Sequence, residues 1–169
     1  LVVGLQSFQT RYASTPNCEA AGDFIFDYFQ TLGLNPSFEP FDFGVTYSSR
    51  NIIAEKRGET DPAEILILCA HYDSTSTAPT TLAPGADDDA SGVAAVLEAA
   101  RILRPCALDF TVRFIAFSAE EWGLNGSRYY AQQARNRGDE LIGVINLGMI
   151  SYADPMPEDL ALFFNNDSE

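Results

Sequence analysis

Two residues near the middle of the sequence, His71 and Asp73, have the types and spacing of a metal ligand and the group that orients it. Where a chain is extended, alternate residues point to the same side, so Asp73 could hydrogen-bond to the second ring nitrogen of His71. A metal-bound imidazole is usually held in this way. The His-x-Asp pattern is weak on its own, and a strand-end histidine making ordinary hydrogen bonds is its commoner explanation.

Three consecutive carboxylates, Asp87, Asp88 and Asp89, form a second cluster. A divalent cation would offset their mutual repulsion, and one carboxylate can bridge two metal ions. The alternative is an acidic first turn that complements the dipole of a helix over residues 91–103. That alternative would be sufficient to explain Asp88 and Asp89.

A third cluster, Glu120 and Glu121, directly follows an apolar segment. One of two neighbouring carboxylates could bind a metal ion while the other accepts a proton from a metal-bound water. For an isolated pair, a solvated turn between a strand and a helix is the better explanation. The three clusters therefore indicate metal chemistry only if the fold brings them together.

Hydrophobic periodicity and turn signals predict the elements that must position these clusters. We expect Asn17 to cap the second helix, Gly33 to end it, and the last strand to be buried. The predicted helices cover residues 1–12, 19–32, 91–103 and 127–137, and the predicted strands cover 51–55, 64–70, 110–117 and 141–147, after an extended segment at 38–43. The alternation of strands and helices predicts one α/β domain with a largely parallel sheet, in which ligands collect at the carboxyl edge.

The composition narrows the possible functions. The 169 residues include 10 Lys plus Arg against 24 Asp plus Glu, and the net charge of −14 argues against binding to nucleic acid or to anionic membranes. No apolar run approaches the roughly 20 residues of a membrane span. Because His71 is the only histidine, one copy of this chain cannot run a mechanism that needs two imidazoles.

The cysteines and the ends of the chain give less information about function. Cys18, Cys69 and Cys106 leave at least one thiol unpaired and lack metal-binding spacing. Cys69 lies in an apolar run and is expected to be buried, whereas the pairing of Cys18 stays open. Since the sequence begins at Leu1 and shows no signal pattern, we expect it to be trimmed at one or both ends.

Taken together, the strings HYDST at 71–75, PGADDDASG at 84–92 and AEEWGLNGSRYY at 119–130 resemble a known family. They are similar to the zinc-dependent exopeptidases of the bacterial leucyl aminopeptidase type, which also include glutaminyl cyclases. The resemblance extends to residues 7–12 and 51–54. It implies a three-layer sandwich with a mixed, mostly parallel sheet between helices. Residues 1–169 would then be the N-terminal major part of a single zinc-aminopeptidase-like domain whose C-terminal strands and helices are missing.

The resemblance also implies roles for individual residues. His71 would bind one of two zinc ions, Asp87 would bridge both, and Glu121 would bind the second. Glu120 would be the general base that acts on the metal-activated water, and Asp73 would orient His71. The implied reaction is the removal of N-terminal residues from peptide substrates by a secreted enzyme.

This sequence departs from the family pattern at two metal ligands. Gly148 stands where family members usually have aspartate, and the histidine that a later segment supplies is absent from a chain that ends at Glu169. Two ligands for each metal fall short of the three that catalytic zinc normally has. We therefore expect weak activity or none, because substitution by Asp88, Asp89, Asp154 or Ser151 has no support in their spacing.

Two alternatives to the aminopeptidase hypothesis stay open. The chain could be a non-catalytic peptidase-like domain that serves binding or dimerisation, as the loss at Gly148 favours and the retention of Glu120 opposes. It could also be related to single-zinc glutaminyl cyclases, which do not need the ligand at position 148. In either case, sheet surface exposed by a missing C-terminal region would favour self-association.

Overall fold

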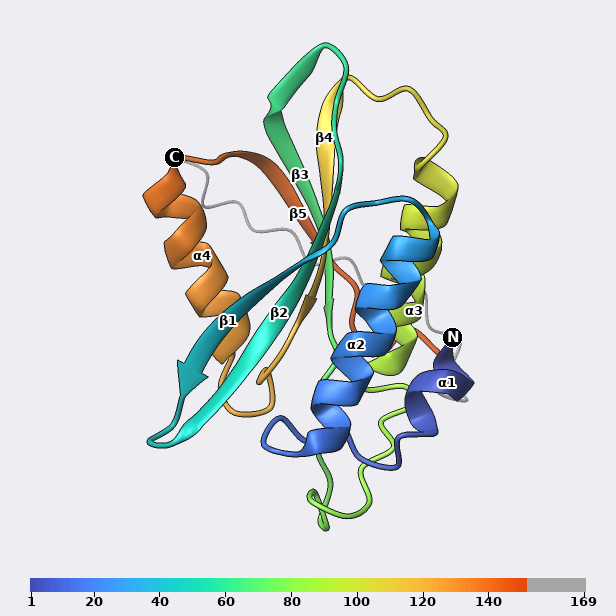
Figure 1. The fold of residues 1–169 in the computed structure, drawn as a ribbon, viewed down its shortest axis with the longest axis vertical. Coiled ribbons are helices and arrows are strands. Elements are labelled where there is room, and N and C mark those ends of the chain that lie inside the picture. The colour runs from blue at the N-terminus through green and yellow to red at the C-terminus, as the bar shows by residue number, and fades with distance from the viewer. Residues whose placement is uncertain (152–169) are drawn as a thin grey trace, which may run out of the picture.

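The computed structural model describes residues 1–151. These residues fold around one five-stranded sheet in the order β1-β2-β4-β3-β5 (Figure 1). The strands are β1 (Ser37–Phe43), β2 (Tyr47–Lys56), β3 (Asp61–His71), β4 (Phe110–Phe117) and β5 (Glu140–Asn146). The helices are α1 (Val2–Gln6), α2 (Pro16–Thr31), α3 (Ala90–Leu103) and α4 (Asn125–Arg137).

The elements form three layers, with α1, α2 and α3 on one face of the sheet and α4 on the other (Figure 1). β3 runs parallel to β4 and to β5, whereas β2 is antiparallel to β1 and to β4. The predicted α/β sandwich with a mixed sheet is confirmed. Its parallel part consists of β3, β4 and β5, the strands that lead into the candidate site.

The amino-terminal segment differs from the prediction at two points. The first helix is confined to α1, and the chain then turns through Gln9, whose φ of 64° lies in the left-handed region. The N-cap of α2 is Thr15 rather than Asn17, because the Thr15 hydroxyl accepts a hydrogen bond from the Cys18 amide at 3.3 Å and Pro16 occupies the first turn. Asn17 instead donates to the Phe8 carbonyl at 2.8 Å.

The Thr15 cap gives a direct test of this correction. Thr15→Ala should lower the free energy of unfolding by about 1 kcal/mol, the usual loss when a capping hydroxyl is removed. The matched change Asn17→Ala removes only an exposed hydrogen bond and should cost less than about 0.5 kcal/mol. Urea denaturation of both variants measures the difference. A larger loss of unfolding free energy for Asn17→Ala than for Thr15→Ala would mean that Asn17, as predicted from the sequence, caps α2.

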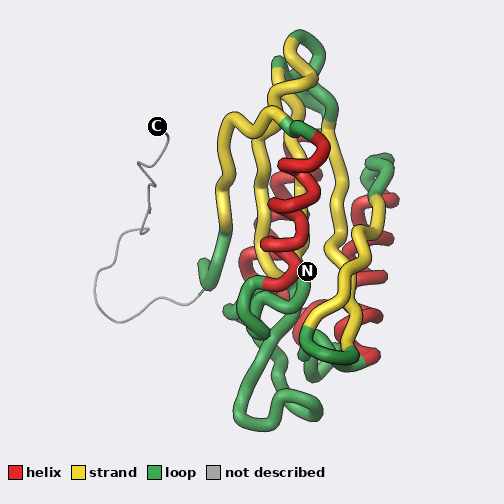
Figure 2. The backbone as a smooth tube through the Cα atoms, turned by 90° about the vertical axis from the view of Figure 1, so that its left-hand side faces the viewer, coloured by secondary structure: helices red, strands yellow, loops and turns green. Residues whose placement is uncertain are grey.

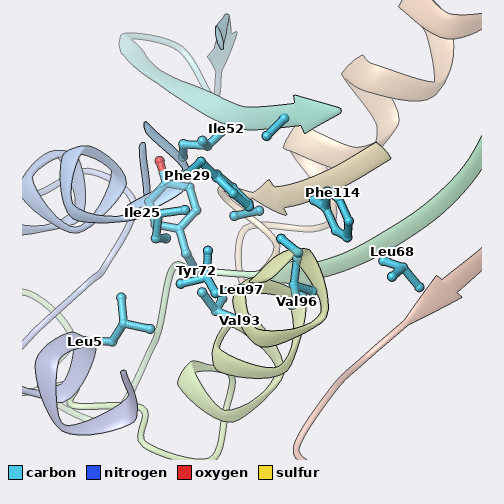
Figure 3. Packing of buried hydrophobic residues seen from close by; sticks show 14 of the residues in the cluster. Leu5, Ile25, Phe29, Ile52, Leu68, Tyr72, Val93, Val96, Leu97 and Phe114 are labelled. Atoms are coloured by element: carbon cyan, nitrogen blue, oxygen red, sulfur yellow. The ribbon is translucent and has the colours of Figure 1, made fainter. Parts of the chain in front are cut away.

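The main hydrophobic core lies between the sheet and the helices α1, α2 and α3 (Figure 3). Its fully buried side chains include Leu5, Ile25, Phe29, Ile52, Tyr72, Val93, Val96, Leu97 and Phe114. A smaller cluster, in which Cys69 is buried as expected, lies under α4. Burial on both faces fixes the carboxyl ends of β3 and β4, which is where the functional clusters begin. All three cysteines are free thiols.

β5 forms as predicted, but the prediction that it is buried is wrong for the described residues. Its side chains Leu141, Ile142, Val144 and Ile145 are 42–58% exposed. The physical reason is position: β5 is at the edge of the sheet and pairs only with β3 among the described strands. Self-association through this surface stays a prediction. Among residues 1–151, no helix combines the length and apolar character needed to cross a bilayer.

Candidate metal and catalytic site

The three clusters predicted from the sequence meet at the carboxyl ends of β3 and β4. His71 is the last residue of β3 and lies in register with Phe117, the last residue of β4, and Glu120 follows shortly after. Figure 2 shows long loops gathered at one end of the sheet. His71, Asp88 and Glu120 line one cavity of about 520 Å³. Residues far apart in the sequence therefore share a single site.

Both ring nitrogens of His71 have acidic or carbonyl neighbours. Nε2 lies 3.1 Å from Oδ1 of Asp88, and Nδ1 lies 3.2 Å from the carbonyl oxygen of Asp73 and 3.6 Å from its carboxylate Oδ1. The His71 side chain is only 13% exposed. Asp73 therefore lies where a group that orients this imidazole would lie, and Nε2 faces Asp88, which lines the cavity together with His71.

Asp73 has a second set of contacts that sequence reasoning missed. Its carboxylate is fully buried and accepts hydrogen bonds from the amides of Glu120 at 3.0 Å and Glu121 at 3.2 Å. One carboxylate thus links the end of β3 to the glutamate pair that follows β4. The spacing of His71 and Asp73 carries no signal for this link, because its partners are 47 and 48 residues away.

The three aspartates point to three different environments. Asp88 is half-exposed and faces His71. Asp89 is buried and accepts from the amides of Gly92, His71 and Met149, so it is both the N-cap of α3 and a link between loops. Asp87 accepts from the amide and hydroxyl of Ser151 at 2.9 and 3.0 Å. Asp88 is therefore the aspartate that faces Nε2 of His71, and the bridging role that the resemblance implied for Asp87 stays a prediction.

Glu120 and Glu121 sit in a tight turn that begins with Ala119 at a φ of 54°. Burial, together with the charge of Asp88, raises the pKa of Glu121 to about 7. The ring of Trp122 packs 5.3 Å from the rings of Tyr12, Phe43 and Tyr47. This aromatic cluster anchors the glutamate turn against the β1–β2 hairpin, and sequence analysis did not identify it.

The same acidic surroundings set the protonation state of His71. Burial alone would lower its pKa, but the hydrogen bond and charge of Asp73 and the charges of Asp89 and Glu120 together raise it to about 9. Burial raises the pKa of Asp89 to about 6. At neutral pH the metal-free site therefore holds a proton on His71, which balances part of the negative charge.

This proton makes zinc binding depend on pH. Zinc needs a neutral imidazole and must displace the proton, so the apparent zinc affinity should rise by about tenfold per pH unit from pH 7 to 9 and level off above. Below the Glu121 pKa of about 7 the dependence should become steeper. Competition titration with a chromophoric chelator at several pH values measures the slope. If the zinc affinity stays constant from pH 7 to 9, zinc binding does not displace a proton from His71.

The donor types in the site suit the zinc ions that the resemblance implies, since imidazole nitrogen and carboxylate oxygen are both common zinc ligands. The number of donors does not. Within residues 1–151, no three His, Cys, Asp or Glu side chains come together as a group able to hold a metal ion. The described residues alone therefore do not form a complete zinc centre. Asp154, one conceivable substitute, lies outside them.

Gly148 lines the same cavity as His71 and Asp88. A Cβ atom built on Gly148 meets no described atom within 4 Å, and its φ is not in the left-handed region. Its neighbours are fixed by hydrogen bonds, from the Leu147 amide to the Cys69 carbonyl and from the Met149 amide to Asp89. Position 148 is therefore an ordered place with room for a larger side chain.

Comparison with known sequences identifies the family. The sequence profile of peptidase family M28 matches residues 51–162. A probable zinc metalloprotease of Pyricularia oryzae is 42% identical over 106 residues, which are 59% of this chain and 20% of the relative. A second, from Pyrenophora tritici-repentis, is 39% identical over 111 residues, covering 64% of this chain and 23% of the relative. The chain thus spans only about a fifth to a quarter of these relatives.

Solved structures agree with the fold. A leucine aminopeptidase precursor of Bacteroides thetaiotaomicron superposes with a TM-score of 0.77 at 23% identity, over 88% of this chain and 60% of that one. A glutaminyl cyclase of Porphyromonas gingivalis gives a TM-score of 0.78 at 26% identity, over 88% and 58%. A Zn-dependent exopeptidase of Parabacteroides distasonis gives 0.76 at 24%, over 88% and 59%. The matched family profile spans His71, Asp88, Glu120 and Glu121. This chain therefore belongs to peptidase family M28, whose members are zinc metallopeptidases.

Proposed function

We propose that this chain supplies part of the active site of an aminopeptidase that removes N-terminal residues from peptides. The observation that carries the proposal is the convergence of His71, Asp88 and Glu120 on one cavity at the carboxyl edge of the parallel strands. The cavity is lined mostly by apolar side chains from β3, α4 and β5, a setting suited to the side chain of a peptide residue. The similar folds of an aminopeptidase precursor and a Zn-dependent exopeptidase support the same proposal.

We assign the roles from the contacts of each side chain. His71, Asp88 and Glu121 are the zinc ligands that the described residues can offer, with Asp88 in the place that the resemblance gave to Asp87. Glu120 is the general base, because it lines the cavity and its amide is held by Asp73. Asp73 positions both His71 and the glutamate turn. Because this ligand set is incomplete, we expect the chain by itself to be weakly active or inactive.

A glutaminyl cyclase relative is the second candidate. The structural similarity to the Porphyromonas gingivalis glutaminyl cyclase supports it as strongly as the similarity to the leucine aminopeptidase precursor supports hydrolysis. The two candidates differ in what a peptide loses: an aminopeptidase releases a free amino acid, whereas a cyclase releases ammonia from an N-terminal glutamine. Both products can be measured in one reaction mixture.

The test uses the wild-type chain and a Gly148→Asp variant, each supplied with zinc and with peptides that begin with leucine or glutamine. We expect the Gly148→Asp variant to release free amino acid slowly and the wild-type chain to release less or none, with release lost on chelation. Glu120→Gln should lower the rate by about a hundredfold or more while zinc binding persists, since a general base contributes about that much. Glu98→Gln, on the exposed face of α3, is the matched control and should change neither the rate of release nor zinc binding.

Zinc binding without release of any amino acid by either form would overturn the aminopeptidase proposal. Ammonia release from the glutamine peptide alone would favour the cyclase. If zinc binds and neither product forms, the non-catalytic peptidase-like domain becomes the best explanation.

A further inference from the structure

Arg11 is the largest fully buried side chain in the described part of the chain, and it donates a hydrogen bond to the main chain of Tyr72, next to His71. Arginine is almost never buried completely unless its charge and donors are matched. The mechanism proposed above does not use Arg11. Its burial therefore calls for an explanation from its contacts.

The guanidinium of Arg11 donates four hydrogen bonds, all to main-chain carbonyl oxygens. Nε donates to Tyr72 at 2.7 Å, and Nη2 donates to Gly85 at 2.9 Å. Nη1 donates to Pro84 at 2.6 Å and to Leu5 at 3.3 Å. Tyr72 lies between His71 and Asp73, and Gly85 shortly precedes the three aspartates. The planar fork thus ties the strand end that carries the histidine to the loop that carries the carboxylates.

The main chain of Arg11 strengthens the same connection. Its amide donates to the Ser74 hydroxyl at 3.1 Å, its carbonyl accepts from the Ser74 amide at 3.2 Å, and the Ser74 hydroxyl donates to the Ala83 carbonyl at 2.6 Å. Residue 11 therefore contacts both segments through its backbone and through its side chain. Lysine, with a single nitrogen, could not reproduce a planar fork that reaches all these carbonyls.

The loop is shaped closely around this side chain at Gly85. A Cβ on Gly85 would lie 2.9 Å from Nη2 of Arg11 and 2.7 Å from Cβ of Ser74, and it would overlap the carbonyl oxygen of Asp88. Gly85 also has a φ of 49°, in the left-handed region that favours glycine. Only a residue without a side chain lets the loop approach Arg11 this closely.

The charge of Arg11 acts in the same direction as its hydrogen bonds. Burial lowers the pKa of Arg11, and the charges of Asp73, Asp89 and Asp88, none of which accepts the four hydrogen bonds described above, act against that lowering. These are the carboxylates that crowd around His71. A buried cation behind them offsets their mutual repulsion when no metal is bound.

We propose that Arg11 is a positioning residue for the site: it fixes the segments 71–74 and 83–89 relative to each other, so that Asp88 faces His71. The importance of this placement for activity rests on the proposed function. The placement itself does not, and it can be measured on the metal-free chain. A role limited to filling the core would instead spread the effect of a substitution over the whole domain.

The experiment is hydrogen exchange of the metal-free chain, followed by mass spectrometry, for Arg11→Lys. We expect exchange in segments 71–75 and 83–90 to accelerate by about tenfold or more, with α2 and β4 unchanged. Arg113→Lys is the matched control, because Arg113 donates to Tyr130 and Asp139, which lie outside segments 71–75 and 83–90. It should leave both segments unchanged. In a second measurement, Arg11→Lys should weaken zinc binding by about tenfold or more, with His71 and Asp88 intact.

Ser74→Ala is the second variant, used if Arg11→Lys does not fold. It removes only the hydroxyl between the Arg11 amide and the Ala83 carbonyl, so it should accelerate exchange at the Arg11 amide and in segment 83–90, with α2 and β4 unchanged. Acceleration spread evenly over the chain, or none in 83–90, would overturn the inference. Failure of the wild-type chain to bind zinc or to act on peptides would overturn the proposed function instead, because the exchange measurement needs neither.

Discussion

Replacing Gly148 with aspartate should raise the zinc affinity of this chain by about tenfold or more. Removing even a group that orients a metal ligand typically changes affinity by about 10- to 100-fold, so adding a direct ligand should have an effect at least as large. Position 148 lines the cavity that contains His71 and Asp88, and the described residues leave open space around a Cβ there. An aspartate there would give a zinc ion held by His71 and Asp88 a third protein ligand, the number that catalytic zinc normally has.

The local backbone favours this outcome. The amides of Leu147 and Met149 are held by the Cys69 carbonyl and by Asp89, so a side chain at position 148 would start from a fixed place near β3. Competition titration with a chromophoric chelator gives the zinc dissociation constant of each form at one pH. Gly148→Asn is the matched control, because it has the same shape without the charge and should give a much smaller gain.

An equal affinity for the Asp and Asn forms, or no gain with either, would mean that position 148 does not reach the metal. The loss of a ligand at Gly148 would then not explain a weak site. Stability must be measured alongside, since glycine to aspartate also restricts the unfolded chain. A change in unfolding free energy without a change in zinc affinity would count against the prediction.

The elements of this fold were largely predictable because their hydrophobic patterns are strong. The strand predicted at 110–117 matches β4, and the helix predicted at 91–103 matches α3 within one residue. Burial of β5 was not predictable, because the apolar run at 141–147 looks the same whether a neighbour covers it or not. Only the order of the strands shows that β5 is at the edge of the described sheet.

The site shows a similar division. The sequence identified three clusters, and the fold brings them together, because residues that follow parallel strands meet at one edge of the sheet. It could not identify which of three adjacent aspartates faces His71, since the direction of each side chain depends on the local path of the loop. Arg11 was part of the family resemblance but had no assigned role, because nothing in a single sequence distinguishes a buried arginine from an exposed one.

The three aspartates should respond differently to the same substitution, and this is the sharpest test of the site. Asp88→Asn should lower zinc affinity by about 100-fold or more, because it removes the charge that faces His71 while the half-exposed side chain keeps its size. Asp87→Asn should change zinc affinity little, since an amide oxygen can still accept from Ser151. Zinc affinity and urea denaturation, measured for each variant, separate binding from folding.

Asp89→Asn should act mainly on folding. The Asp89 carboxylate accepts from the amides of His71, Gly92 and Met149, using both oxygens. An asparagine keeps one of the two oxygens as an acceptor and turns a donor toward the remaining amide, so unfolding free energy should fall by about 1.5–3 kcal/mol. If instead Asp87→Asn abolishes zinc binding and Asp88→Asn does not, the ligand inferred from family resemblance is correct. The contact between Asp88 and His71 would then be a feature of the metal-free site alone, and binding would have to reorganise the loop before α3.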